Sequence, residues 1–159
     1  MCCLSELAIR QELRQFPAPF MSLTLSDAIK GKVNSSTKEK VVDMALKMTS
    51  LHYQYSGLIL TLASQAMTNG YPINRPLWWI DPTDPVAQTI DSEYLLGDDV
   101  LVAPVLQTGA VTKDIYLPKG VWRDEADPSH PVYTGPMWLY SYSAPLDILP
   151  YFTRVSPLQ

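Results

Sequence analysis

Apolar side chains between residues 36 and 69 recur every three or four positions, as one face of a helix requires. Ser36-Thr37-Lys38-Glu39 has the spacing of a capping box, in which Ser36 accepts from the Glu39 amide. Asn69-Gly70 favours the left-handed residue that ends many helices. The pattern therefore predicts one helix of about 30 residues, with Gly57 marking a bend or a close contact near its centre. Its apolar face consists of Val41, Ala45, Met48, Leu51, Tyr55, Leu58, Ile59, Leu62 and Ala66.

The chain after Gly70 is a series of short apolar runs separated by turn residues. Regular short strands with such turns between them are typical of a β-sandwich. We expect turns at 81–85, 97–99, 108–109, 118–120 and 127–129. The predicted strands cover residues 71–80, 94–96, 100–106, 112–117, 132–133, 137–142 and 148–155.

The distribution of proline supports this division of the 159 residues, because only two of the 14 prolines precede residue 71. The 47% apolar content supplies a hydrophobic core and argues against a disordered tail. The net charge of −4 argues against a nucleic-acid partner, since no basic surplus is available for phosphates. No apolar run approaches the roughly 18 residues of a membrane span.

Paired carboxylates are the first candidates for chemistry, because glycoside, phosphate and peptide chemistry all use them. Asp81 and Asp84 lie in a proline-rich turn, where aspartate commonly caps its own backbone. Asp98-Asp99 follows a glycine in another predicted turn. The third group, Asp124, Glu125 and Asp127, belongs to a hydrophilic loop. For all three groups we expect a structural or solvated role, with catalysis as the alternative.

Histidine and cysteine give no metal-binding pattern. We expect His52 to be a satisfied interior or surface residue of the helix, and His130 to lie in a loop without an evident partner. Cys2 and Cys3 are adjacent and poorly placed to pair. Asn34-Ser35-Ser36 matches the N-glycosylation pattern, which makes Asn34 a candidate site. No cofactor-binding motif is evident.

Several strings of the second half closely resemble the C-terminal part of glycoside hydrolase family 31. They are YPINRPLWW at 71–79, LLGDDVLVAPVL at 95–106, IYLPKGVW at 115–122 and APLDILPYF at 144–152. Residues 5–70 are similar to the family more loosely, through Glu6-Leu7, Ile9-Arg10 and the segment 17–22. The tryptophan pair followed by Asp81-Pro82 is most similar to an animal branch of the family.

The resemblance implies an α+β fold in which the C-terminal end of a (β/α)8 barrel precedes an antiparallel β-sandwich. Residues 1–80 would be the end of the barrel, with its last strand at 72–80, and residues 81–159 the sandwich. A whole barrel takes about 250 residues, more than the chain contains. We therefore expect exposed apolar faces at Leu51, Leu58, Leu62 and Trp78, and self-association of the isolated chain.

The activity implied by the resemblance is retaining hydrolysis of O-glycosyl bonds in α-glycosides. Both catalytic aspartates of the family lie upstream of the segment that corresponds to Glu6–Arg10, so no catalytic residue is assigned here and the chain alone is expected to be inactive. The carbohydrate contacts in this chain are not defined by the sequence, and glucoside and galactoside substrates stay open. The family also suggests the secretory pathway or membrane anchoring through a further N-terminal segment.

Two other functions remain open for the same residues. The β-sandwich could be a non-catalytic interaction module, or it could bind sugar through exposed aromatic rings. A sugar-binding module would require Trp122 or Trp138 to be exposed, because sugar rings stack on aromatic faces.

Overall fold

The computed structural model describes residues 35–155, and side chains from residue 40 onward. The expectations for Cys2, Cys3, Asn34 and the segments 5–10 and 17–22 lie outside this range, as do the side chains of the capping box. The described chain divides into two compact units. One unit includes the first helix and residues 106–110, and the other includes the second helix and all the strands.

Two helices stand where the sequence predicts one. Helix α3 covers Ser35–Gln54 and helix α4 covers Ser56–Asn69, with Tyr55 interrupting them. The prediction of a continuous helix is thus wrong. Ser56 Oγ donates to the Tyr53 carbonyl at 2.7 Å, and a serine followed by a glycine is a common site of helix kinks. The end at Gly70 is confirmed, because this residue has φ of 73° and its N–H bonds the Ala66 carbonyl.

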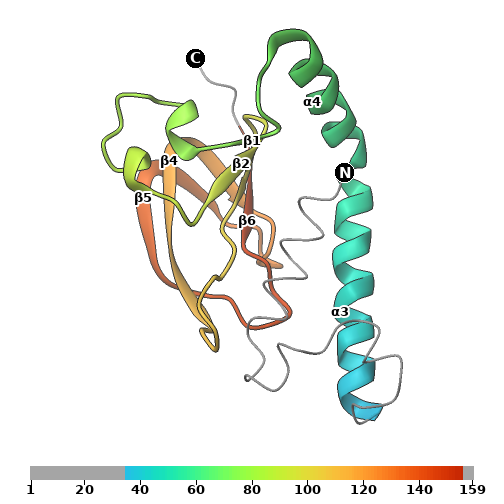
Figure 1. Ribbon diagram of the computed structural model, residues 1–159. Helices are drawn as coiled ribbons and strands as arrows, with labels where there is room; N and C mark the ends of the chain where they lie inside the picture. The colour runs from blue at the N-terminus through green and yellow to red at the C-terminus, as the bar shows by residue number, and fades with distance from the viewer. Residues whose placement is uncertain (1–34, 156–159) are drawn as a thin grey trace. The chain divides into compact units, whose positions relative to one another are not determined.

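The six strands form one antiparallel sheet in the order β1-β2-β3-β6-β4-β5 (Figure 1). The expected antiparallel β domain is therefore present, accompanied by few helices. The two longest strands, β4 and β5, make a hairpin, and β6 joins them to the shorter strands. The bounds are β1 Asn74–Arg75, β2 Tyr94–Leu96, β3 Val100–Val102, β4 Thr112–Asp124, β5 Val132–Ser143 and β6 Tyr151–Arg154.

The first predicted strand, 71–80, is mostly wrong. Only Asn74–Arg75 are extended and paired, and they pair antiparallel with β2. Pro76 then begins a 3-10 turn, η2, over Leu77–Trp79, in which the Trp79 N–H bonds the Pro76 carbonyl. Pro76 itself has no N–H to give to a strand partner.

The turn predicted at 118–120 is also wrong, because β4 continues through it with an irregular register between Leu117 and Gly120. The opposite strand explains how this is possible. A Cβ atom on Gly135 would lie 2.2 Å from the Pro118 carbonyl oxygen, so the two backbones approach as only glycine allows. The two short strands expected at 132–133 and 137–142 are accordingly one strand, β5.

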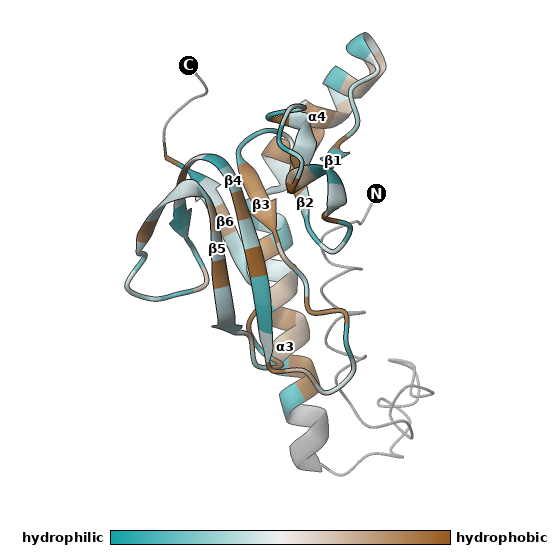
Figure 2. Cartoon of the chain, turned by 90° about the vertical axis from the view of Figure 1, so that its left-hand side faces the viewer, coloured by the Kyte–Doolittle hydropathy of each residue, from teal (hydrophilic) through white to brown (hydrophobic). Residues whose placement is uncertain are grey.

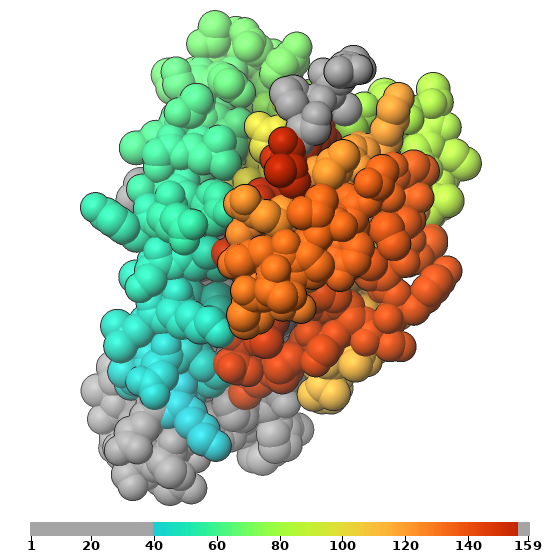
Figure 3. Space-filling model, turned by 180° about the vertical axis from the view of Figure 1, so that it is seen from behind, coloured from blue at the N-terminus to red at the C-terminus, as the bar shows by residue number. Residues whose placement is uncertain are grey.

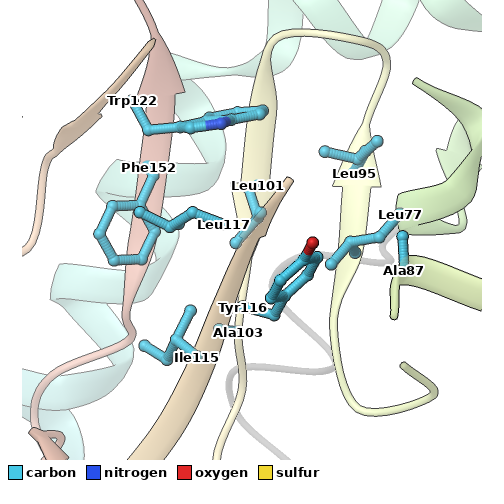
Figure 4. Packing of buried hydrophobic residues seen from close by; sticks show 10 residues of the cluster. All are labelled: Leu77, Ala87, Leu95, Leu101, Ala103, Ile115, Tyr116, Leu117, Trp122 and Phe152. Carbon is cyan, nitrogen blue, oxygen red and sulfur yellow. The ribbon is translucent and has the colours of Figure 1, made fainter. Parts of the chain in front are cut away.

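The hydrophobic core lies among β2, β3, β4 and β6 (Figure 4). Brown, apolar segments are seen on β3 and on the long strands (Figure 2). In Figure 4, Trp122 and Phe152 lie toward one end of this core, and Leu77 and Ala87 lie beyond Leu95 at the other. The core residues are Leu77, Ala87, Leu95, Leu101, Ala103, Ile115, Tyr116, Leu117, Trp122 and Phe152.

Helix α4 contacts the turn between β2 and β3. The expectation that Leu62 is exposed is wrong, because Leu62 is buried and a Cβ atom on Gly97 would lie 3.0 Å from its Cδ2. Gly97 also has φ of 64°, in the left-handed region. Gly97 is therefore required both by the tight turn and by the close packing of Leu62.

Candidate functional site

The proline-rich turn after η2 uses its aspartates to hold the local fold, as expected. Asp81 Oδ1 accepts from the Thr83 hydroxyl at 2.6 Å and from the Thr83 N–H, and these bonds lower the pKa of Asp81. Asp84 Oδ1 accepts from the N–H groups of Val86 and Ala87, at the start of the 3-10 turn η3 (Ala87–Thr89). Its other oxygen accepts from the Tyr116 hydroxyl at 2.6 Å. This pair is a structural feature that ties the turn to β4.

Asp98 is paired with a buried arginine. Arg75 of β1 bonds the Asp98 carboxylate and donates from Nε to the Pro72 carbonyl at 3.0 Å. Its guanidinium also lies 5.6 Å from the centre of the Tyr71 ring and 5.4 Å from that of Trp79. The sequence singled out Asp98 but not its partner, because residues 23 positions apart meet only through the β1–β2 pairing.

The acidic group at the end of β4 has a structural role, one of the two roles expected for it. Asp124 is fully buried, and its Oδ1 accepts from the N–H groups of Ala126 and Asp127. Burial opposes ionisation of Glu125, but hydrogen bonds from Thr153 and Arg123 lower its pKa. These contacts make Asp124 and Glu125 parts of the structure.

His130 has partners, contrary to the expectation. Its Nδ1 lies 3.0 Å from the Asp124 carbonyl oxygen and 3.4 Å from Glu125 Oε2. Its φ of 48° places it in the left-handed region, where the loop turns back into β5. The carboxylate of Asp127 bonds Ser129 within the same loop, and this contact lowers the pKa of Asp127.

A buried acid and a lysine were missed by the sequence analysis. Glu93 Oε1 accepts from the Tyr116 N–H at 3.0 Å, and its Oε2 is buried without a hydrogen bond. Burial raises the pKa of Glu93 to about 7. Lys113 donates to the carbonyls of Ser92 and Pro104 at 2.7 and 2.9 Å, and burial lowers its pKa. A single polar residue before an apolar strand gives no sequence signal for such a site.

The tryptophans divide into buried and accessible residues. Trp122 is fully buried and its Nε1 donates to the Pro118 carbonyl at 2.8 Å, so the expectation that it could bind sugar is wrong. Trp138 is half-buried, and its ring centre lies 6.0 Å from that of exposed Tyr140 with the planes inclined by 15°. Of the two tryptophans considered, only Trp138 is partly exposed.

No group of three potential metal ligands comes together among the side chains that the structure describes. His52 is half-buried on α3, and within the described part of the chain its Nδ1 has no hydrogen-bond partner. The unbonded Nδ1 atom does not fit the expectation that the polar groups of His52 are satisfied. Neither described helix has the length and apolar character needed to cross a bilayer.

The chain is similar to known carbohydrate-active proteins. Residues 70–156 match the model of the glycosyl hydrolase family 31 C-terminal domain. The chain is 42% identical over 124 residues to the myogenesis-regulating glycosidase of Mus musculus, covering 74% of this chain and 16% of that protein. It is 43% identical over 96 residues to human neutral alpha-glucosidase AB, covering 59% of this chain and 10% of the enzyme.

A solved structure shares the fold as well as the sequence. The Flavobacterium johnsoniae dextranase FjDex31A, in complex with isomaltotriose, superimposes with a TM-score of 0.68 at 35% identity. The match covers 72% of this chain and 14% of the dextranase. The chain thus spans less than a fifth of the length of these relatives.

Proposed function

Because the chain belongs to glycosyl hydrolase family 31, we propose that it is the C-terminal portion of a retaining α-glycosidase that hydrolyses O-glycosyl bonds. The observation that carries this proposal is the match of residues 70–156 to the C-terminal domain of the family. The same segment contains all six strands of the sheet. Relatives that share it include an α-glucosidase and a dextranase.

In this proposal, residues 1–80 are the end of the catalytic (β/α)8 barrel and residues 81–159 are the β-sandwich that follows it. The packing of Leu62 against Gly97 and the bond between Arg75 and Asp98 support a fixed attachment of the first segment to the sheet. Both contacts join residues before position 81 to the β2–β3 turn. The sheet would then support the helix that precedes the last strand of the barrel.

The chemistry of this family requires two carboxyl groups, one to attack the anomeric carbon and one to protonate the leaving oxygen. The carboxylates of Asp84 and Asp124 are engaged by N–H and hydroxyl donors, and Glu125 bonds Arg123 and Thr153. These groups are committed to the fold. As the family resemblance implies, the nucleophile and the general acid would lie upstream of the segment that corresponds to Glu6–Arg10.

Hydrolysis assays on two forms of the protein test the proposal. The native polypeptide would be captured with an antibody against the β4–β5 hairpin and compared with the isolated 159-residue chain. We expect the captured protein to release nitrophenol from a para-nitrophenyl α-glucoside or α-galactoside and the isolated chain to release none. Activity of the isolated chain would contradict the assignment of the catalytic acids. Inactivity of a longer captured protein toward both substrates would contradict the proposed hydrolase activity.

We place the full-length protein in the secretory pathway, where an Asn-Ser-Ser acceptor at Asn34 could be glycosylated. Treatment of the captured protein with an endoglycosidase should lower its mass, and the Asn34→Gln variant should show a correspondingly smaller shift. An identical shift in both proteins would exclude Asn34 as the acceptor.

A further inference from the structure

Tyr140 and Trp138 form an exposed aromatic surface on β5, which is an edge strand because it pairs with β4 alone in the described sheet. Tyr140 is 72% exposed although its ring lies close to that of Trp138 and nearly parallel to it. Trp138 in turn contacts Tyr116 of the core, with ring centres 5.2 Å apart. The exposed Tyr140 ring is thus backed by Trp138, which itself packs against the core.

A β-bulge places Tyr140 in this position. Between the pairs Lys113–Tyr142 and Ile115–Leu139, one residue of β4 opposes two residues of β5, Tyr140 and Ser141. Bulges re-aim side chains and are frequent next to binding sites. In a regular strand, residues 138, 140 and 142 would all point to the same side.

The bulge separates two tyrosines that strand alternation would keep together. Tyr142 packs its ring against Phe152 at 5.9 Å and donates its hydroxyl to Asp124, while Tyr140 remains exposed. Ser141 between them has φ of 53°, a conformation that costs energy for a residue other than glycine. Asp114 holds this conformation, because its Oδ1 accepts from the Ser141 N–H at 2.7 Å.

We propose that the Trp138–Tyr140 surface is a glycan-binding site, separate from catalysis, that stacks on the apolar face of a pyranose ring. Three observations support a sugar as the occupant. The Tyr140 ring stacks on Trp138 with the planes inclined by only 15°, and its own exposure leaves it open to a sugar ring. An aromatic face with a polar hydroxyl rim suits a ligand that is apolar on its ring faces and polar at its edges. The exposed carboxylate of Asp114 beside the bulge adds an acceptor for sugar hydroxyls.

The β4–β5 hairpin, orange in Figure 3, lies uncovered over much of its length in that view. The choice of α-glucans as probes rests on the proposed function, but stacking on Tyr140 needs no catalytic group. Failure of the hydrolase proposal would therefore leave the binding result intact, and the reverse also holds.

Titration of the 159-residue chain with isomaltotriose tests the site through tryptophan fluorescence and calorimetry. We expect saturable binding with a Kd on the order of 1 mM and a loss of at least about tenfold in Tyr140→Ala. Tyr140→Trp should retain binding, because it keeps an aromatic face. Tyr53→Ala, which removes another highly exposed tyrosine from α3, is the matched control and should bind as the parent does.

The bulge supplies a second test through Asp114, which holds the Ser141 N–H and offers the sugar an acceptor. Asp114→Ala frees the Ser141 N–H and should weaken binding, whereas Asp114→Asn keeps a carbonyl acceptor and should restore it. Thermal denaturation of each variant separates lost binding from lost folding.

Three outcomes would overturn the proposal. One is the absence of saturable binding in a folded chain at about 10 mM sugar. A second is binding that is equal in Tyr140→Ala and the parent. The third is a sugar-independent dimer that Tyr140→Ala dissociates, since the occupant of the surface would then be a second copy of the chain.

Discussion

The Tyr142 hydroxyl donates to Asp124 Oδ2 at 2.8 Å, linking the interior of β5 to the last residue of β4. Burial and this carboxylate raise the pKa of Tyr142, so the phenol stays a protonated donor. Because the other Asp124 oxygen holds two backbone N–H groups of the following loop, a single buried side chain joins the loop and the hairpin.

Replacing Asp124 should destabilise the chain strongly. Asp124→Ala leaves the Tyr142 hydroxyl and two N–H groups without their acceptor, which we expect to cost about 3 kcal/mol of unfolding free energy. Tyr142→Phe removes one hydrogen bond and should cost about 1 kcal/mol. Urea denaturation measures both losses. Asp127→Ala, which alters only the exposed end of the loop, is the control and should cost less than Tyr142→Phe; equal losses in all three variants would refute the ranking.

Gly135 should tolerate no side chain. A Cβ atom there would overlap the Pro118 carbonyl oxygen at 2.2 Å and lie 2.7 Å from that of Leu117. Both are backbone atoms and cannot rotate away, so Gly135→Ala should cost on the order of 3 kcal/mol. Gly57→Ala is the matched control, because nothing lies within 4 Å of its added Cβ and alanine favours a helix. Similar melting temperatures for the two variants would contradict the close approach of β4 and β5.

Glu93 should make stability depend on pH. Burial raises its pKa from 4.5 to about 7 in the folded chain, so folding favours the protonated acid. Its contribution is fully present below pH 4.5 and is lost as the pH rises through about 7. The loss amounts to at most about 3 kcal/mol.

The Glu93→Gln variant isolates this contribution. Its amide oxygen can still accept from the Tyr116 N–H, but it does not titrate. The difference in melting temperature between the parent and Glu93→Gln should therefore shift in favour of the variant between pH 4.5 and pH 7. A difference that stays constant over this range would show that Glu93 ionises alike in the folded and unfolded chains.

Self-association of the isolated chain is expected from the apolar residues that α4 exposes. Leu60 and Met67 are 71% and 91% exposed, and in the proposed enzyme the remainder of the barrel would cover such side chains. The double variant Leu60→Ser and Met67→Ser should lower the average mass measured by sedimentation equilibrium. Gln65→Ser, an exposed polar change on the same helix, should leave it unaltered. A parent chain that sediments as a monomer would contradict the expectation.

Sequence pattern located the strands better than it located their limits. Alternation and turn residues identified β2 and the approximate positions of β3 and β6. They failed at Pro118 and Gly135. Each residue type commonly interrupts a strand, but here the two lie against each other and both strands continue past them. Such mutual compensation is a tertiary effect that a local pattern does not contain.

The carboxylates show a similar limit for the candidate sites. Their structural role was predictable, because aspartate in a proline-rich turn usually caps backbone groups, as Asp84 does. Burial of Asp124 and the raised pKa of Glu93 arise from packing between distant strands. The exposure of Tyr140 likewise depends on a bulge that strand alternation does not reveal.

The mass of the native polypeptide tests the central claim most directly. An antibody against the β4–β5 hairpin would capture the protein from its natural source for intact mass spectrometry. If the chain is the C-terminal portion of an α-glycosidase, the captured polypeptide should be several times heavier than 17.8 kDa and contain both catalytic aspartates. A native species of 17.8 kDa would contradict the account, because no catalytic pair would then accompany the sheet.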